Sequence, residues 1–122
     1  MWFPCKLHAT MMLRLVIVWL LVTSSVFAID VRQQVLTRNQ WPQYINGYNL
    51  LALPAVNQTL RLFDENDSIR IVIQYPGGDP GKQWATELYG WLVSFGIPTH
   101  YLELEPGSGA GDQLIVTVID RR

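Results

Sequence analysis

Cysteine is almost absent from this chain of 122 residues, which has a single one, Cys5. A disulfide within the chain is therefore excluded, as is a zinc site built from several thiolates. Histidine is nearly as rare, with only His8 and His100. The sequence thus offers few of the side chains that most often act as nucleophile, general base or metal ligand.

Charged residues are also scarce, at 16% of the chain, whereas 49% of the residues are hydrophobic. This balance is too apolar for a disordered protein, and the length allows one domain. The longest apolar run, Leu15–Val22, follows Arg14 and precedes the polar residues Thr23, Ser24 and Ser25. The order of a basic residue, an apolar run and small or polar residues predicts a secretory signal peptide over residues 1–28.

Val26 and Ala28 occupy the two positions that signal peptidase inspects, which predicts cleavage before Ile29. Translation from Met11 or Met12 instead of Met1 would give a shorter signal of the same kind. The alternative is an uncleaved membrane anchor, although a spanning helix needs about 20 apolar residues. We expect a periplasmic protein that meets the membrane only if the signal segment is not cleaved.

Removal of residues 1–28 would take away Lys6 and Arg14, leaving seven basic residues against ten acidic ones, a formal charge of −3. The remaining chain has no cluster of Lys and Arg. Nucleic acid, which is held by neutralising phosphates, is therefore not an expected partner, and neither is an anionic lipid surface.

A strand is predicted at Ile69–Tyr75, where apolar and polar residues alternate. Asp79 is then predicted to be the N-cap of a helix whose first residue is Pro80. This helix carries one apolar stripe and ends at Gly96; the stripe consists of Trp84, Ala85, Leu88, Trp91, Leu92 and Phe95.

An earlier helix is predicted within Leu50–Glu65, and two later strands at Tyr101–Glu105 and Leu114–Ile119. The sequence therefore predicts an α+β fold for residues 50–122: a small sheet with a parallel strand-helix-strand crossover, a C-terminal antiparallel hairpin, and helices on one face. Residues 29–49 show no sustained period and are predicted to be an irregular N-terminal segment.

The loop between the first strand and its helix is the most distinctive candidate site. It contains Tyr75, Gly77, Gly78, Asp79 and Gly81. Glycines before a helix can expose backbone N–H groups to a ligand, and loops at the carboxyl ends of strands are common binding sites. The alternative is a tight turn that only connects strand and helix.

Aromatic residues suggest a second candidate, a contact patch made of Trp41, Tyr44 and Tyr48 for a protein or a glycan.

No catalytic or metal-binding motif is recognisable, and no cofactor is predicted. Glu103 and Glu105 share one face of a strand and are most simply the solvated side of the sheet. A small periplasmic enzyme or metal-binding protein would have to use Glu103 with Asp79, His100 and Asp112.

The succession of elements over residues 50–119 resembles the C-terminal, peptidoglycan-associating domain of outer membrane protein A, also found in peptidoglycan-associated lipoprotein and flagellar motor stators. Ile69–Tyr75 is similar to the strand of that family, Trp84-Ala85 stands where an Arg-Ala pair belongs, and Tyr89–Pro98 is similar to the end of its helix.

The resemblance implies a split α/β fold and an envelope partner. The family binds the diaminopimelate carboxylates of peptidoglycan with an aspartate and an arginine, but this chain has Pro76-Gly77-Gly78 and Trp84 at the corresponding places. We therefore expect an exported, non-enzymatic module that binds an envelope protein or a cell-wall component such as peptidoglycan.

Overall fold

The computed structural model describes residues 29–121, so the predicted signal peptide at 1–28 lies outside the described residues. Within the described range, no helix is both long and apolar enough to cross a membrane. The elements, in chain order, are β1 (Asp30–Thr37), the 3-10 turn η1 (Arg38–Gln40), α2 (Gly47–Leu51), α3 (Pro54–Leu62), β2 (Ile69–Tyr75), α4 (Asp79–Ser94), the 3-10 turn η2 (Thr99–Tyr101), β3 (Leu102–Pro106) and β4 (Gln113–Asp120).

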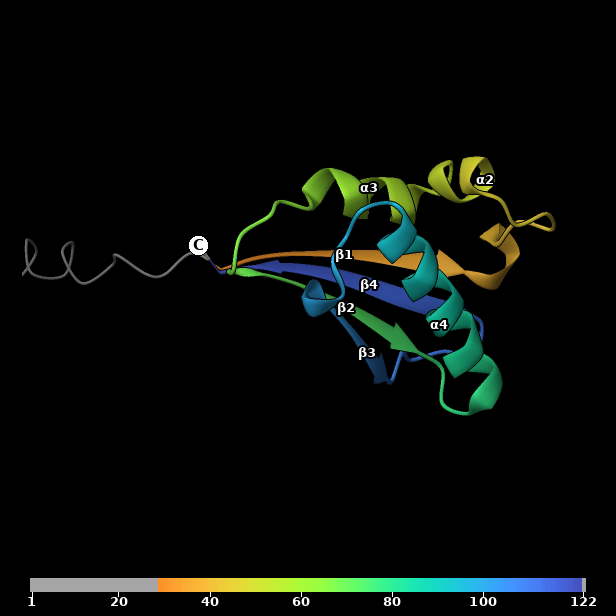
Figure 1. The fold of residues 1–122 in the computed structure, drawn as a ribbon. Helices are drawn as coiled ribbons and strands as arrows, with labels where there is room; N and C mark the ends of the chain where they lie inside the picture. Colours follow the sequence, from red (N-terminus) through yellow and green to blue (C-terminus); the bar gives the residue numbers. More distant parts are fainter. Residues whose placement is uncertain (1–28, 122) are drawn as a thin grey trace, which may run out of the picture.

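The strands form one sheet in the order β1-β4-β2-β3 (Figure 1). β2 and β3 are parallel neighbours joined through α4, whereas β4 runs antiparallel to both β1 and β2. The predicted α+β class and the parallel strand-helix-strand crossover are therefore confirmed.

The two C-terminal strands differ in detail from a simple hairpin. β3 and β4 follow each other along the chain and run in opposite directions, as predicted, but β2 lies between them in the sheet. Burial explains this order. In β4 even Thr117, on the face away from the helices, is buried, so this strand takes a central place. β3 carries Glu103 and Glu105 and ends at Pro106, which suits an edge.

The N-terminal segment is more regular than its sequence predicts. Residues 30–37 form the eight-residue strand β1, paired along its whole length with β4. Its apolar residues Val31 and Val35 lie on the exposed face, and only Leu36 is fully buried. An edge strand with one buried side chain lacks the alternating pattern by which strands are recognised.

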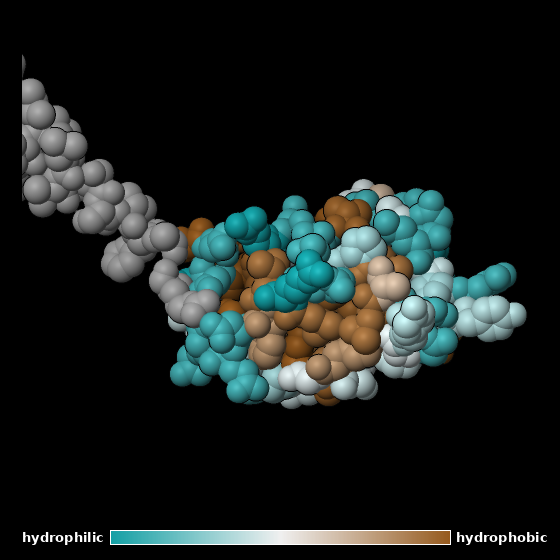
Figure 2. All heavy atoms as spheres, turned by 90° about the horizontal axis from the view of Figure 1, so that it is seen from above, coloured by the Kyte–Doolittle hydropathy of each residue, from teal (hydrophilic) through white to brown (hydrophobic). Residues whose placement is uncertain are grey.

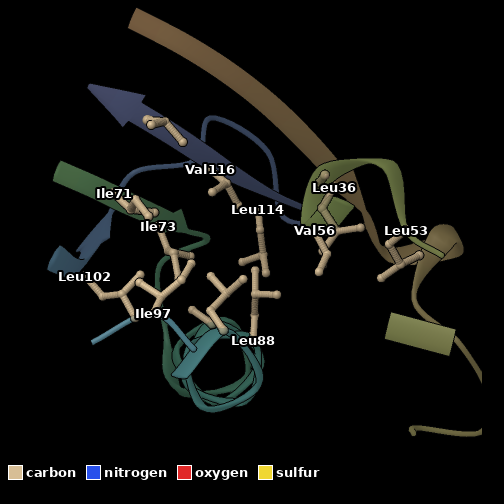
Figure 3. Close-up of a cluster of buried hydrophobic side chains, with 14 of the residues drawn as sticks. Leu36, Leu53, Val56, Ile71, Ile73, Leu88, Ile97, Leu102, Leu114 and Val116 are labelled. Carbon is tan, nitrogen blue, oxygen red and sulfur yellow. The ribbon is translucent and has the colours of Figure 1, made fainter. Parts of the chain in front are cut away.

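The core lies between the sheet and the helices, which cover one face. α3 packs over β1 and β4, and α4 packs over β2 and β3. Figure 3 shows side chains from both layers meeting in this core; they include Val56, Ile71, Ile73, Leu88, Leu114 and Val116. The apolar stripe of the second predicted helix therefore docks on the sheet as expected, with Trp84, Leu88 and Leu92 buried.

The start of α4 differs from the prediction by one residue. Gly78 is the N-cap, with a φ of 99°, and Asp79 is the first helical residue. Because φ is positive at residue 78, glycine is favoured there over any residue with a side chain. Asp79 thus stabilises the helix only as a negative charge in its first turn.

Replacing Asp79 by alanine is consequently expected to lower the free energy of unfolding by only about 0.5 kcal/mol, instead of the roughly 1 kcal/mol lost with a cap. Urea denaturation at low and at 1 M salt measures this. The difference from wild type should shrink in high salt, because salt screens the interaction between charge and helix dipole. A loss that is larger and independent of salt would mean that Asp79 caps the helix after all.

Candidate functional site

The predicted loop after β2 is held firmly in place. The carbonyl oxygen of Tyr75 accepts hydrogen bonds from the backbone N–H groups of Gly107 (2.8 Å) and Ser108 (3.2 Å). These bonds join the end of β2 to the connection between β3 and β4. Tyr75 is half-buried, while Gly77, Gly78 and Asp79 are exposed.

Close packing explains one more glycine of this loop. A Cβ atom added at Gly81 would lie 2.2 Å from the carbonyl oxygen of Pro76, whereas one added at Gly77 would meet nothing within 4 Å. The glycines at 78 and 81 therefore serve the geometry of a tight strand-to-helix turn. Gly77 alone has no such structural requirement.

A hollow of about 210 Å³ adjoins the start of α4. It is lined by Arg38, Pro80, Gly81, Trp84, Gly111 and Asp112. The guanidinium carbon of Arg38 lies 4.8 Å from the centre of the Trp84 ring, and the backbone N–H of Arg38 donates to the carbonyl oxygen of Asp112 at 2.6 Å. The fold therefore brings Arg38, Trp84 and Asp112 together around this hollow. Nothing in the sequence indicates that these three residues are neighbours.

Trp84 itself belongs to the core, since only 4% of its surface is exposed. The ring of Trp41 meets it edge to face, with 6.0 Å between the ring centres. The indole N–H of Trp84 is buried without a hydrogen-bond partner among the described residues. A buried indole cannot act as a cation that binds carboxylates.

The predicted aromatic patch divides into two parts. Trp41 packs partly into the core against Trp84, whereas Tyr44 and Tyr48 are 79% and 84% exposed. Ile45 and Leu51, which the sequence analysis did not single out, are also exposed, at 42% and 40%. We call Tyr44, Ile45, Tyr48 and Leu51 the α2 patch. The signal for it was present in the sequence, because residues 44–51 contain no charged residue.

The α2 patch stands at the end of the domain remote from the described chain termini (Figure 1). Its backbone is fixed by two hydrogen bonds. The side-chain oxygen of Asn46 accepts from the N–H of Asn49 at 2.8 Å, and the side-chain amide of Asn49 donates to the carbonyl oxygen of Tyr44 at 2.9 Å. From the other side, a Cβ added at Gly47 would be in contact with the rings of Trp91 and Phe95, so this part of α2 rests on α4.

Apolar side chains also reach the surface on the face that Figure 2 shows, where a brown area is framed by teal polar side chains. The aliphatic residues of α3 and α4 that are only partly buried against the core are Leu60, Leu62 and Val93. Continuous apolar surface of this kind is typical of a face that meets another molecule.

The carboxylates considered for catalysis or metal binding do not gather. Glu103 forms an ion pair with Arg70 (3.0 Å) on the uncovered face of the sheet, and the carbonyl oxygen of His100 accepts from the same guanidinium at 3.3 Å. Asp112 lines the hollow beside Arg38 instead. Across residues 29–121, no three His, Cys, Asp or Glu side chains are placed to hold a metal ion.

Comparison with known proteins adds no relative: no family model matches the chain, and no curated protein matches it.

Proposed function

We propose that this protein is an exported, non-enzymatic module of a bacterial cell envelope, and that it binds another envelope protein through the α2 patch. The observation that carries the proposal is the exposure of four large apolar or aromatic side chains within eight residues, 44–51. Scattered single apolar residues are ordinary on a protein surface, whereas several exposed ones in one short segment favour a contact site.

Tyrosine suits such a contact for a physical reason. Its ring supplies a large apolar area with few rotatable bonds, and its hydroxyl can bond to a polar partner. The hydrogen bonds of Asn46 and Asn49 hold the backbone that carries Tyr44 and Tyr48, so little ordering entropy would be lost on binding.

A protein partner is favoured over a cell-wall glycan by the aliphatic members of the patch. Stacking on a sugar ring uses aromatic faces, but Ile45 and Leu51 add hydrophobic area of the kind found in the centre of protein interfaces. Peptidoglycan bound in the manner of the outer membrane protein A family is disfavoured, because the aspartate and arginine of that family are replaced by Pro76-Gly77-Gly78 and the buried Trp84.

The envelope setting of this proposal rests on the predicted signal peptide and on the resemblance over residues 50–119. Both are properties of the sequence. A domain with a formal charge of −3 and no basic cluster has little attraction for nucleic acid or anionic lipid.

The test is a double variant, Tyr44→Ser with Tyr48→Ser, compared with wild type in the capture of envelope proteins and of peptidoglycan sacculi. The full chain is expressed with an affinity tag, and the exported protein is used as bait. We expect one or a few envelope proteins to be retained by wild type and lost with the double variant. The matched control, Gln83→Ala with Glu87→Ala, changes two exposed residues of α4 and should retain them.

Three outcomes separate the alternatives. Retention on sacculi that depends on Tyr44 and Tyr48 would replace the protein partner by a cell-wall component. Capture that is equal for all variants would contradict the assignment to the α2 patch. No specific capture by wild type would contradict the binding function.

A further inference from the structure

β1 is an edge strand of the sheet. Its pairing with β4 shows which of its backbone N–H and C=O groups point away from the sheet. The N–H of Arg38 donates to the carbonyl oxygen of Asp112, which extends the register in which Asp30 lies opposite Asp120. In an antiparallel pair, alternate residues bond to the same neighbour. The even-numbered residues therefore bond to β4, and the N–H and C=O groups of Val31, Gln33 and Val35 face away from it.

This edge carries the charged residues Asp30 and Arg32, but it lacks several other features that usually prevent one strand from pairing with another. β1 is eight residues long and contains no proline or lysine, and its register with β4 is unbroken. Val31 and Val35 are 55% and 49% exposed. The other edge strand, β3, is protected in the expected manner, since it has five residues, two glutamates and a terminal proline.

The open part of the edge ends at Thr37. Its backbone N–H, which also faces away from β4, is occupied by the side-chain oxygen of Gln40 at 3.0 Å. The groups left for a partner strand are thus confined to the stretch centred on Gln33.

We infer that β1 pairs antiparallel with β1 of a second copy of this chain, about a twofold axis through Gln33, to give one continuous sheet of two domains. A twofold axis through one residue of an edge strand pairs the same stretch of both copies, which is an isologous contact. In this register Val31 of each copy lies opposite Val35 of the other, on the exposed face. Both exposed valines of β1 are then covered by apolar partners.

The charges of β1 agree with this register. Arg32 lies opposite the uncharged Gln34 of the second copy and keeps the ion pair of 3.3 Å with Asp30 of its own strand. A register shifted by one residue toward the N-terminus would place the two Arg32 guanidinium groups opposite each other, which is unfavourable.

The proposed dimer uses β1, whereas the proposed partner contact uses the α2 patch, so each can fail without the other.

Cross-linking through single cysteines tests the register. The full chain carries Cys5→Ser, and one cysteine is introduced at a time by Gln33→Cys or Val31→Cys. Across the proposed axis the two residues at 33 face each other, within the roughly 4.4–6.8 Å that a disulfide spans between Cα atoms. The two residues at 31 are offset by four positions, roughly 13 Å.

We expect mild oxidation to give a disulfide-linked dimer with Gln33→Cys and none with Val31→Cys, and sedimentation to show a dimer for wild type. The variant Gln33→Pro provides a second measurement. It removes an N–H that faces away from β4, so the fold should persist by circular dichroism while the dimer is lost. A folded wild type that sediments as a monomer, or stronger cross-linking at residue 31 than at 33, would overturn the inference.

Discussion

Replacing Leu88 by alanine is expected to lower the free energy of unfolding by about 3 kcal/mol. Leu88 is fully buried near the middle of α4, where Figure 3 shows it pointing at the sheet. The loss combines the transfer energy of the removed carbons with the cavity that they leave behind. In a small domain that is stabilised by roughly 5–15 kcal/mol in total, this is a large fraction.

Urea denaturation of the exported protein measures this loss. Glu87→Ala is the matched control, because Glu87 is the exposed neighbour of Leu88 on the same helix and its replacement should change stability by less than about 0.5 kcal/mol. Equal effects of the two changes would mean that α4 does not dock on β2 and β3 by this face.

Replacing Gly81 by alanine is expected to cost a similar amount, about 3 kcal/mol, for a different reason. The added methyl group would lie 2.2 Å from the carbonyl oxygen of Pro76 and 3.0 Å from its carbonyl carbon. These are backbone atoms, so no side-chain rotation can relieve the contact, and the first turn of α4 must move away from the end of β2.

Gly90, on the same helix, supplies the control for this experiment. It is exposed, and a Cβ there would meet nothing within 4 Å. Gly90→Ala should therefore stabilise the domain by about 0.5–1 kcal/mol, since alanine is the better helix former. The two substitutions should shift the thermal midpoint in opposite directions, and a destabilisation of the same size at both sites would contradict the close approach of Pro76 and Gly81.

The sequence predicted those elements in which apolar residues recur with the regular spacing of a strand or a helix. Ile69–Tyr75 alternates and forms β2, and the apolar stripe from Trp84 to Leu92 forms the buried face of α4. The crossover between β2 and β3 followed from their order. These predictions succeeded because each element has one buried face and one exposed face, which fixes its register with the core.

The remaining features depend on contacts that no local pattern contains. The apolar residues of β1 do not alternate, and Val31 and Val35 lie on the exposed face, so the strand could not be recognised before its pairing with β4 was known. The strand order, with β2 between β3 and β4, depends on how deeply each strand is buried, and the spacing of residues along the chain does not determine this. The meeting of Arg38, Trp84 and Asp112 joins three segments that are far apart in the sequence.

Contacts between distant segments also decide how the residues of the candidate sites are placed. Tyr44 and Tyr48 are exposed, as a contact patch requires, while Leu50 in the same segment is buried in the core. Trp41 was assigned to the same patch by proximity in sequence, but its ring packs against Trp84. In the loop after β2, the glycines at 78 and 81 are explained by a positive φ and by a close backbone contact.

The central claim, binding of an envelope protein through the α2 patch, is tested most directly by photo-cross-linking in living cells. A photoreactive phenylalanine analogue is placed at Tyr48 in one strain and at Glu87, on the exposed face of α4, in another. The account predicts a discrete covalent adduct with an envelope protein from position 48 and none from position 87. Adducts of equal yield from both positions, or none from position 48, would contradict it.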